Sequence, residues 1–257
     1  MSSNDGTKKT LIVAFSLCIV CSVIVSTAAV LLKPAQEANK ALDKKRNILA
    51  AAGMLDDSLS IDEQFAQISS RIIDLRTGKF SDAEDPERFN QRKAAKDPSA
   101  SEKLSAEDDI AKISRRENYA VVYLVGVDGD NFDKVILPIH GAGLWSTLYG
   151  FIALESDVNT VAGLGFYEHG ETPGLGGEVD NPRWKALWPG KQVYREGEAA
   201  LGLIKGSVDA KSSNAAWEID GLSGATLTAR GVTNLVQFWL GDNGYSQFLN
   251  NLKSGEA

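Results

Sequence analysis

Histidine and cysteine are scarce in this 257-residue chain, which limits the metal and disulfide chemistry that it can carry. The only histidines are His140 and His169, and both cysteines, Cys18 and Cys21, fall in one apolar segment. A structural zinc site needs several nitrogen or sulfur ligands, and a disulfide framework needs several cysteines. The composition therefore argues against a zinc site or a disulfide framework in the rest of the chain.

Basic residues are also fewer than acidic residues in this chain. The formal net charge is −7, and residues 1–33, with one Asp and three Lys, carry +2, which leaves −9 on the remaining residues. Neutralising nucleic-acid phosphates requires Lys and Arg. The acidic balance therefore argues against a nucleic acid as a partner.

The one long uncharged run covers residues 10–32. As a helix it is long enough to cross a bilayer core of ~30 Å. A cleaved signal peptide, with its cleavage site near residues 26–29, is the alternative, but its apolar core is usually only ~7–15 residues long. We predict a membrane anchor over residues 10–32, preceded by a cytoplasmic N-terminus of residues 1–9.

The orientation of this anchor is not decided by its flanking charges. Two lysines precede the run and five basic residues follow it within residues 33–46. This count favours a cytoplasmic C-terminal side, but long domains cross membranes despite such flanks. Within the run, Cys18 and Cys21 share one helix face. They form either a thiolate pair or, as we expect without other ligands nearby, small packing residues.

Residues 33–117 are predicted to be a helical and charged connecting region. Helix-forming residues indicate a helix over residues 34–52 that ends near Gly53. A second helix is expected over residues 60–75, with Ser60 and Glu63 as a capping box. The polar stretch 79–117 is interpreted as a solvated linker, partly helical around residues 106–113.

Residues 118–257 alternate between strand-like and helix-like segments. Asp-Gly in the segment 127–130 separates two apolar runs, which is typical of a hairpin. The expected strands cover residues 119–125, 132–139, 148–154, 161–167, 200–204 and 217–219, and helical segments cover 182–188, 229–240 and 244–252. We predict an α+β domain with a mostly antiparallel, twisted sheet and flanking helices.

A short Gly-rich turn, Asp-Gly-Leu-Ser-Gly-Ala-Thr at residues 220–226, precedes the longest of these helical segments. Gly221 and Gly224 allow a close backbone approach, and Ser223 is a candidate N-cap. A helix N-terminus favours an anion, so a phosphate near Thr226 is physically reasonable. From these residues alone, a capped turn that binds no ligand is the more common structure for such a segment. The Gly-Lys-Ser/Thr of a P-loop is absent.

Two more Gly-rich segments follow predicted strands. Residues 140–146 (His-Gly-Ala-Gly-Leu-Trp-Ser) carry Trp145, and residues 168–177 (Glu-His-Gly-Glu-Thr-Pro-Gly-Leu-Gly-Gly) form a long polar loop. Loops of this kind either bind ligands or are simple turns. No Ser-His-Asp arrangement is evident, and we expect no catalytic residue and no metal ligand in this chain.

These three segments, in this order behind one N-terminal anchor, resemble the C subunit of the sodium-translocating NADH:quinone oxidoreductase family. They are more distantly similar to the G subunit of the Rnf electron-transport complex. The resemblance implies that Thr226 is joined to FMN by a phosphoester, and that Thr228, the nearby rival hydroxyl, is not. It also implies a separate Mg²⁺-dependent flavin transferase, whose motif begins at Asp220 and which takes FMN from FAD and releases AMP.

The resemblance further implies a cleft for the isoalloxazine ring beside the attachment point. The residues that we expect to line or frame the cofactor site are Trp145, Glu171, Thr172, Leu175, Gly176, Asp220, Leu222, Ser223, Gly224, Ala225 and Leu227. A flavin ring needs a partly apolar cleft with a few polar groups, and this set supplies both.

By the same resemblance, the chain relays electrons through covalent FMN in a complex that oxidises NADH, reduces ubiquinone and pumps Na⁺. Its partners would be the other membrane subunits, on which NADH and ubiquinone act, since this chain lacks a dinucleotide-binding Gly-x-Gly-x-x-Gly context. The location implied is the bacterial inner membrane, single-pass, with a periplasmic C-terminal domain. The alternatives are an Rnf-type subunit with the same cofactor, or an anchored binding or assembly domain without flavin.

Overall fold

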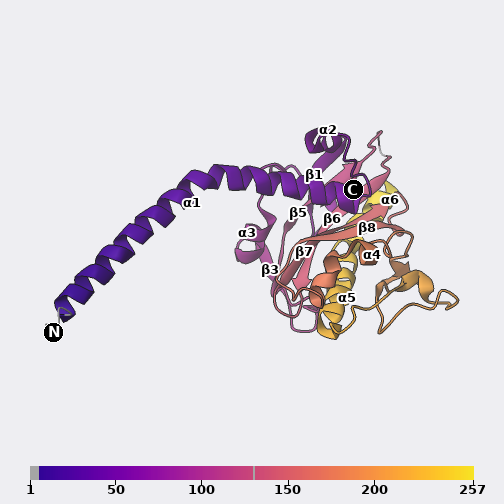
Figure 1. Ribbon diagram of the computed structural model, residues 1–257. Coiled ribbons are helices and arrows are strands. Elements are labelled where there is room, and N and C mark those ends of the chain that lie inside the picture. The colour runs from indigo at the N-terminus through magenta and orange to yellow at the C-terminus, as the bar shows by residue number, and fades with distance from the viewer. Residues whose placement is uncertain (1–5, 130) are drawn as a thin grey trace. The chain divides into compact units, whose positions relative to one another are not determined.

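The computed structural model describes residues 6–129 and 131–257 (Figure 1). Two compact units divide the chain, Met1–Lys44 and Lys45–Ala257, and each is considered by itself. Residues 1–5 of the predicted N-terminus and Asp130 of the predicted hairpin turn lie outside the described residues.

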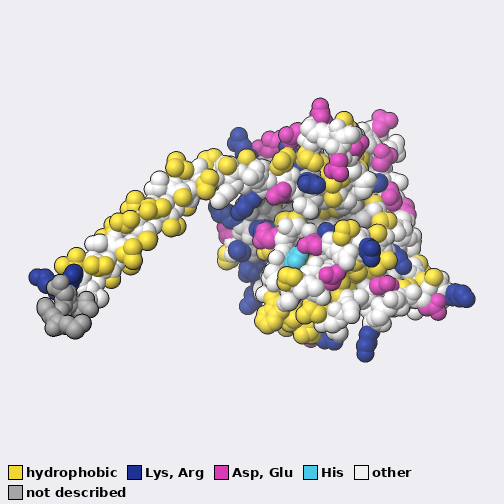
Figure 2. Space-filling model, viewed as in Figure 1, with side chains coloured by type: hydrophobic (Ala, Val, Ile, Leu, Met, Phe, Trp, Pro, Cys, Tyr) yellow, Lys and Arg dark blue, Asp and Glu magenta, His cyan; other side chains and the backbone are white. Residues whose placement is uncertain are grey.

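The first unit is the greater part of α1 (Thr7–Ala51). This helix is long and apolar enough to cross a membrane by length and composition, and Figure 2 shows hydrophobic side chains along most of it. The two helices predicted over residues 10–32 and 34–52 are one, because α1 continues through Pro34. A proline removes only one intrahelical N–H, and the flanking residues are strong helix formers.

The second unit is built on a six-stranded sheet in the order β2-β1-β5-β6-β7-β8, in which every neighbouring pair is antiparallel. The strands are β1 (Ile68–Asp74), β2 (Lys79–Phe80), β5 (Tyr119–Val125), β6 (Lys134–Ala142), β7 (Thr147–Glu155) and β8 (Val161–Glu168). The first four predicted strands, which correspond to β5, β6, β7 and β8, are therefore confirmed, as is the α+β class with flanking helices.

Both faces of the sheet are buried, which explains why its strands read as continuous apolar runs rather than alternating ones. In β5, Val122 and Leu124 point into the core that also contains α5 (Thr226–Leu240) and α6 (Ser246–Ser254). Val121 and Tyr123 point to the other face and pack with Ile48, Leu49 and Ala52 at the end of α1 and just beyond it.

The remaining elements are short and lie in the connections. They are α2 (Ile61–Phe65), α3 (Gln91–Lys96), β3 (Ser101–Lys103), β4 (Arg115–Glu117), η1 (Gly176–Asp180), α4 (Pro182–Lys185), β9 (Tyr194–Arg195), β10 (Glu198–Ala199), β11 (Gly202–Leu203), η2 (Ala215–Trp217) and β12 (Glu218–Ile219). β11 and β12 pair in parallel and lead into the turn before α5. The predicted segments 182–188, 200–204, 217–219, 229–240 and 244–252 correspond to α4, β11, β12, α5 and α6.

The helix predicted over residues 60–75 is wrong. The Ser60–Glu63 capping box is present, but α2 ends after five residues and the chain then enters β1. β1 pairs with β5 over seven residues, and its isoleucines fit the buried sheet better than a helix face. The sheet thus includes residues of the predicted connecting region 33–117.

The predicted helix around residues 106–113 is also wrong, because the segment consists of turns there. Residues 79–117 are not simply a solvated linker, since Ser101, Arg116 and Glu117 are buried. Arg116 donates from Nη1 to the Asn243 carbonyl (2.8 Å) and from Nη2 to Glu102 (3.2 Å). The bond to Asn243 attaches the polar segment to the residues before α6, and the bond to Glu102 joins β4 to β3.

Glu117 is the most unusual of these groups because its side chain is fully buried. Its Oε1 accepts a hydrogen bond from Gln91 Nε2 (2.5 Å), while its Oε2 has no partner among the described residues. Burial raises the pKa of Glu117 from 4.5 to about 7. Because the folded-state pKa is the higher one, folding favours the protonated acid, and stability falls as pH rises from about 4.5 through 7.

We expect Glu117→Gln to be more stable than the parent chain at pH 8 and nearly equal to it at pH 4.5. The pKa difference corresponds to roughly 3 kcal/mol at high pH, and the amide still accepts the Gln91 bond. Urea unfolding of the full chain, followed by tryptophan fluorescence across this pH range, measures the difference. Glu107→Gln, at an exposed position of the same polar segment, is the control. A Glu117→Gln variant that is destabilised at pH 8 would contradict the prediction.

Candidate functional site

The turn over residues 220–226 connects β12 to the start of α5. The helix begins at Thr226, Ala225 occupies the N-cap position, and no side chain caps the helix. The prediction that Ser223 is the N-cap is therefore wrong. Gly224 has φ +71°, so the chain turns between Ser223 and the helix and places the serine out of capping position.

The uncapped start of α5 leaves polar groups open to solvent. The N–H groups of Thr226, Leu227 and Thr228 have no backbone or side-chain acceptor among the described residues. The Thr226 hydroxyl is exposed and also lacks a hydrogen-bond partner within residues 6–129 and 131–257. With no acidic residue in the first turn, this end of the helix keeps the full positive potential of its dipole.

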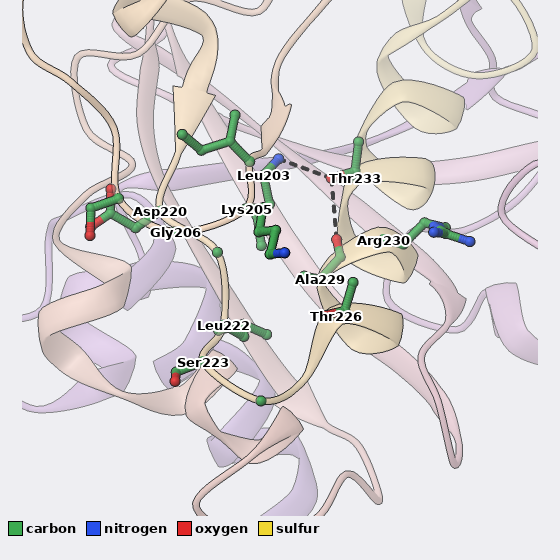
Figure 3. Close-up of a pocket in the computed structure, with 14 residues that line it drawn as sticks. Leu203, Lys205, Gly206, Asp220, Leu222, Ser223, Thr226, Ala229, Arg230 and Thr233 are labelled. Atoms are coloured by element: carbon green, nitrogen blue, oxygen red, sulfur yellow. Dashed lines mark hydrogen bonds between the residues drawn. The ribbon is translucent and has the colours of Figure 1, made fainter.

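A cavity of about 620 Å³ opens beside Thr226 (Figure 3). Its walls are the end of β11 with the residues that follow, the turn before α5, and the first two turns of α5. The lining residues are Leu203, Ile204, Lys205, Gly206, Ser207, Asp220, Gly221, Leu222, Ser223, Gly224, Thr226, Ala229, Arg230 and Thr233. A cavity of this size, with two basic side chains and the start of α5 at Thr226 in its lining, fits a phosphorylated small molecule.

The carboxylate of Glu171 connects the loop between β6 and β7 to the start of α5. It accepts hydrogen bonds from the N–H groups of Leu144 (3.1 Å), Trp145 (2.9 Å) and Ser146 (3.3 Å). It also accepts one from the buried Thr228 hydroxyl (2.6 Å). Two of the three predicted Gly-rich segments, and the helix that follows the third, are therefore joined at this one side chain.

Glycines make room for this carboxylate. A Cβ on Gly143 would lie 2.5 Å from Glu171 Oε1, and a Cβ on Gly176 would lie 2.7 Å from Oε2. These distances are too short for any side chain. The predicted site residue Gly176 is buried and leaves space for the Glu171–Thr228 contact.

Glu171 is ionised in the folded chain. Burial acts to raise its pKa, but the hydrogen bonds from Thr228 and the three backbone N–H groups outweigh burial and lower the pKa below 4.5. The stabilisation that this lowered pKa provides is present above about pH 4.5 and is lost as pH falls through the folded-state value. The carboxylate is thus a fixed anion that holds the loop to the helix.

Four large apolar side chains are exposed around this junction. Trp145 is 71% exposed, Leu227 53%, Leu144 45% and Leu175 43%. We refer to Leu144, Trp145, Leu175 and Leu227 as the apolar patch. None of these four residues lines the cavity. Gly224 lines the cavity and also approaches the apolar patch, since a Cβ on Gly224 would lie 3.0 Å from Leu175 Cδ2. Figure 2 shows hydrophobic side chains gathered at the lower edge of the domain, which α5 reaches in Figure 1.

The other predicted site residues have different surroundings. Leu222 and Ala225 are buried and fix the turn in the core, and the Asp220 carbonyl accepts a bond from Trp184 Nε1 (3.0 Å). Asp220 Oδ1 accepts a bond from the Val208 N–H (2.8 Å). Thr172, like Ser223, is exposed. Through the Glu171 bonds and the approach of Leu175 to Gly224, the segments that carry Trp145, Glu171 and Leu175 lie next to the start of α5.

Two basic residues of the cavity were not predicted from the sequence. Arg230 follows Thr226 by four residues on one helix, so its position on the same face could have been inferred. Lys205 precedes Thr226 by twenty-one residues and reaches the cavity only through the pairing of β11 with β12. No periodicity or motif in the sequence indicates that pairing.

The region that contains this site matches a known protein family. Residues 143–241 match the FMN-binding domain family. The C subunit of the Na(+)-translocating NADH-quinone reductase of Pseudomonas aeruginosa is 55% identical over the whole of both chains. That of Vibrio anguillarum is 51% identical over 99% of this chain and 98% of its own length. The chain belongs to the family of Na(+)-translocating NADH-quinone reductase C subunits.

Solved structures of this family agree with the fold. The crystal structure of Shewanella oneidensis NqrC has a TM-score of 0.77 at 39% identity, covering 84% of this chain and 99% of that one. The C subunit from Parabacteroides distasonis has a TM-score of 0.65 at 29% identity, covering 85% and 96%. The resemblance found in the sequence, and the assignment to an oxidoreductase subunit, are confirmed.

Thr226 and Thr228 form a matched pair for testing the role of the Glu171 junction. We expect Thr228→Val to lower the free energy of unfolding by about 1–3 kcal/mol, because a buried bond to a charged group is lost. Thr226→Val should change it by less than about 0.5 kcal/mol, since that hydroxyl is exposed and unbonded. Urea denaturation of both flavin-free variants at pH 7 tests the contrast, and equal effects would refute it.

Proposed function

We propose that this chain is a membrane-anchored flavoprotein subunit that carries FMN on Thr226 and relays electrons in a Na⁺-translocating NADH:quinone reductase complex. One observation carries the proposal. Thr226 presents a free, exposed hydroxyl at the uncapped start of α5, inside the segment that matches the FMN-binding domain family. The proposal that the chain works in this complex rests on its family membership, because its relatives are named as subunits of that reductase.

The donor set around Thr226 fits a phosphodiester. In the proposed attachment, the Thr226 Oγ attacks the FMN-side phosphorus of FAD, the P–O bond of the diphosphate breaks, and AMP leaves. The hydroxyl proton passes to a base of the separate Mg²⁺-dependent transferase. The three free N–H groups at the start of α5 then face the new phosphodiester, and the helix dipole stabilises its charge.

The apolar patch is the proposed support for the isoalloxazine ring. Trp145, Leu175 and Leu227 offer exposed apolar surface next to the attachment point, and Thr172 adds a polar group at its edge. Glu171 would act indirectly, by holding the loop that carries Trp145. FMN, when bound, supplies the ability to accept and pass on one or two electrons.

The proposed location is the bacterial inner membrane, with residues 10–32 spanning it and the C-terminal domain in the periplasm. The apolar part of α1 supports the span. A single helix cannot enclose an ion path, so the Na⁺ path and the NADH and ubiquinone sites belong to the other subunits.

Two alternatives are less well supported. An Rnf-type subunit would carry the same cofactor, but the relatives reported above are named as the C subunit of the quinone reductase. An anchored domain without flavin would not account for the match to the FMN-binding domain family. It would also not account for the free hydroxyl at the start of α5.

Mass spectrometry after co-expression with the flavin transferase tests the attachment. We expect the mass of FMN, added through a phosphoester, on the tryptic peptide that contains Thr226. The Thr226→Val variant should be colourless, whereas Thr228→Val should keep the flavin. A label on Thr228, or a protein without flavin absorbance, would reject the assignment.

A reporter pair fused to the C-terminus tests the orientation. With a periplasmic domain, an alkaline phosphatase fusion should be active and a green fluorescent protein fusion exported by the same route should be dark. The reverse pattern would place the domain in the cytoplasm, as the basic residues after the anchor suggest by count.

A further inference from the structure

Lys205 is a cation without a counter-ion in the cavity beside Thr226. Figure 3 shows its side chain directed into the cavity, toward the first turn of α5 with Thr226 and Ala229. It makes no ion pair or hydrogen bond with any residue of the described ranges 6–129 and 131–257. Lys205 is exposed, so water solvates its ammonium, but the ammonium and the positive end of the helix dipole still both favour an anion in the space between them.

The backbone around Lys205 is held in place on both sides, so this arrangement is built into the fold. The Leu203 N–H donates to Thr233 Oγ1 (2.9 Å) and the Ile204 N–H to the Ile219 carbonyl (2.9 Å). After Lys205, the Gly206 carbonyl accepts a bond from the Gly221 N–H (2.8 Å). A Cβ on Gly221 would lie 2.3 Å from the Ile204 carbonyl oxygen, so the two segments touch through their backbones.

The other charges of the cavity do not neutralise Lys205. Arg230 is a second cation, and Figure 3 shows its guanidinium pointing away from Lys205. Asp220 is the one acidic residue among those lining the cavity, and its Oδ1 accepts the Val208 N–H on the other side of the turn. The space between Lys205 and the start of α5 is therefore positive from both directions.

We propose that Lys205 is the counter-ion of the phosphodiester on Thr226 and positions it. The ligand class is a phosphate mono- or diester, bound between the lysine ammonium and the N–H groups of Thr226, Leu227 and Thr228. This inference rests on the proposed function. With its phosphate held on the cavity side of the turn, the flavin extends across Gly224 toward the apolar patch. Lys205 makes no contact with the reacting ring, so it is a positioning residue.

Inorganic phosphate is the probe for the site before the flavin is attached. The full chain, made without the transferase and labelled with ¹⁵N-threonine, is titrated with phosphate in detergent. We expect the Thr226 and Thr228 amide signals to shift and saturate, and the Thr233 signal to move less. Lys205→Met should weaken this binding by about three- to fivefold, the effect of losing one partly exposed ion pair. Lys205→Arg should restore most of it.

Lys211→Met is the matched control, because Lys211 is exposed in the same connection but does not line the cavity. It should leave phosphate binding unchanged. Absence of a saturating shift in the parent chain, or equal weakening by Lys205→Met and Lys211→Met, would overturn the inference.

A second measurement uses the flavinylated chain. The ³¹P resonance of the phosphodiester should move in Lys205→Met and not in Lys211→Met, while mass spectrometry confirms equal flavin content. If Thr226 carries FMN and the ³¹P resonance is the same in all variants, the role of Lys205 is refuted and the proposed function stands. If Thr226 carries no flavin, the proposed function itself fails.

Discussion

The carboxylate of Glu171 is the group on which the arrangement of the site depends. Its oxygens accept bonds from three consecutive N–H groups of one loop and from a buried hydroxyl of α5. The loop, the polar segment after β8 and the helix are far apart in the sequence, and this anion joins them. Because four hydrogen-bond donors surround it, the Glu171 carboxylate stays ionised although the residue is only 5% exposed. Trp145 and Thr226 therefore lie on parts of the chain that are held together by one acid.

The turn at residues 220–226 separates two different environments. On one side is a cavity whose lining includes the charged residues Lys205, Arg230 and Asp220, and on the other is the apolar patch. A flavin nucleotide has the same division, with an anionic phosphate at one end and a flat, largely apolar ring at the other. The match between this division and the two sides of one exposed threonine is the physical basis for the proposed attachment.

Much of this site could be predicted from the sequence, because its motifs lie in short contiguous segments. The central strands were recognised since both faces are buried and their residues are apolar throughout. β1 was missed because Ser60 and Glu63 begin a real helix, and nothing local shows that it ends after one turn. Ser223 was misplaced because the left-handed conformation of Gly224, which decides where α5 starts, is not visible in residue types. Lys205 depends on a strand pairing between distant residues, which no local pattern encodes.

The end of α1 has a consequence for how this protein can be divided. Ile48, Leu49 and Ala51 are buried against the sheet, and Lys134 Nζ donates to the Ala52 carbonyl (2.9 Å). The backbone of Ala51 also lies against Gly163, where a Cβ would come 2.4 Å from its oxygen. The last turn of α1 is thus part of the domain core. A soluble fragment that starts at Gly53 would lose these buried contacts on one sheet face, so a fragment that keeps them has to begin before Ile48.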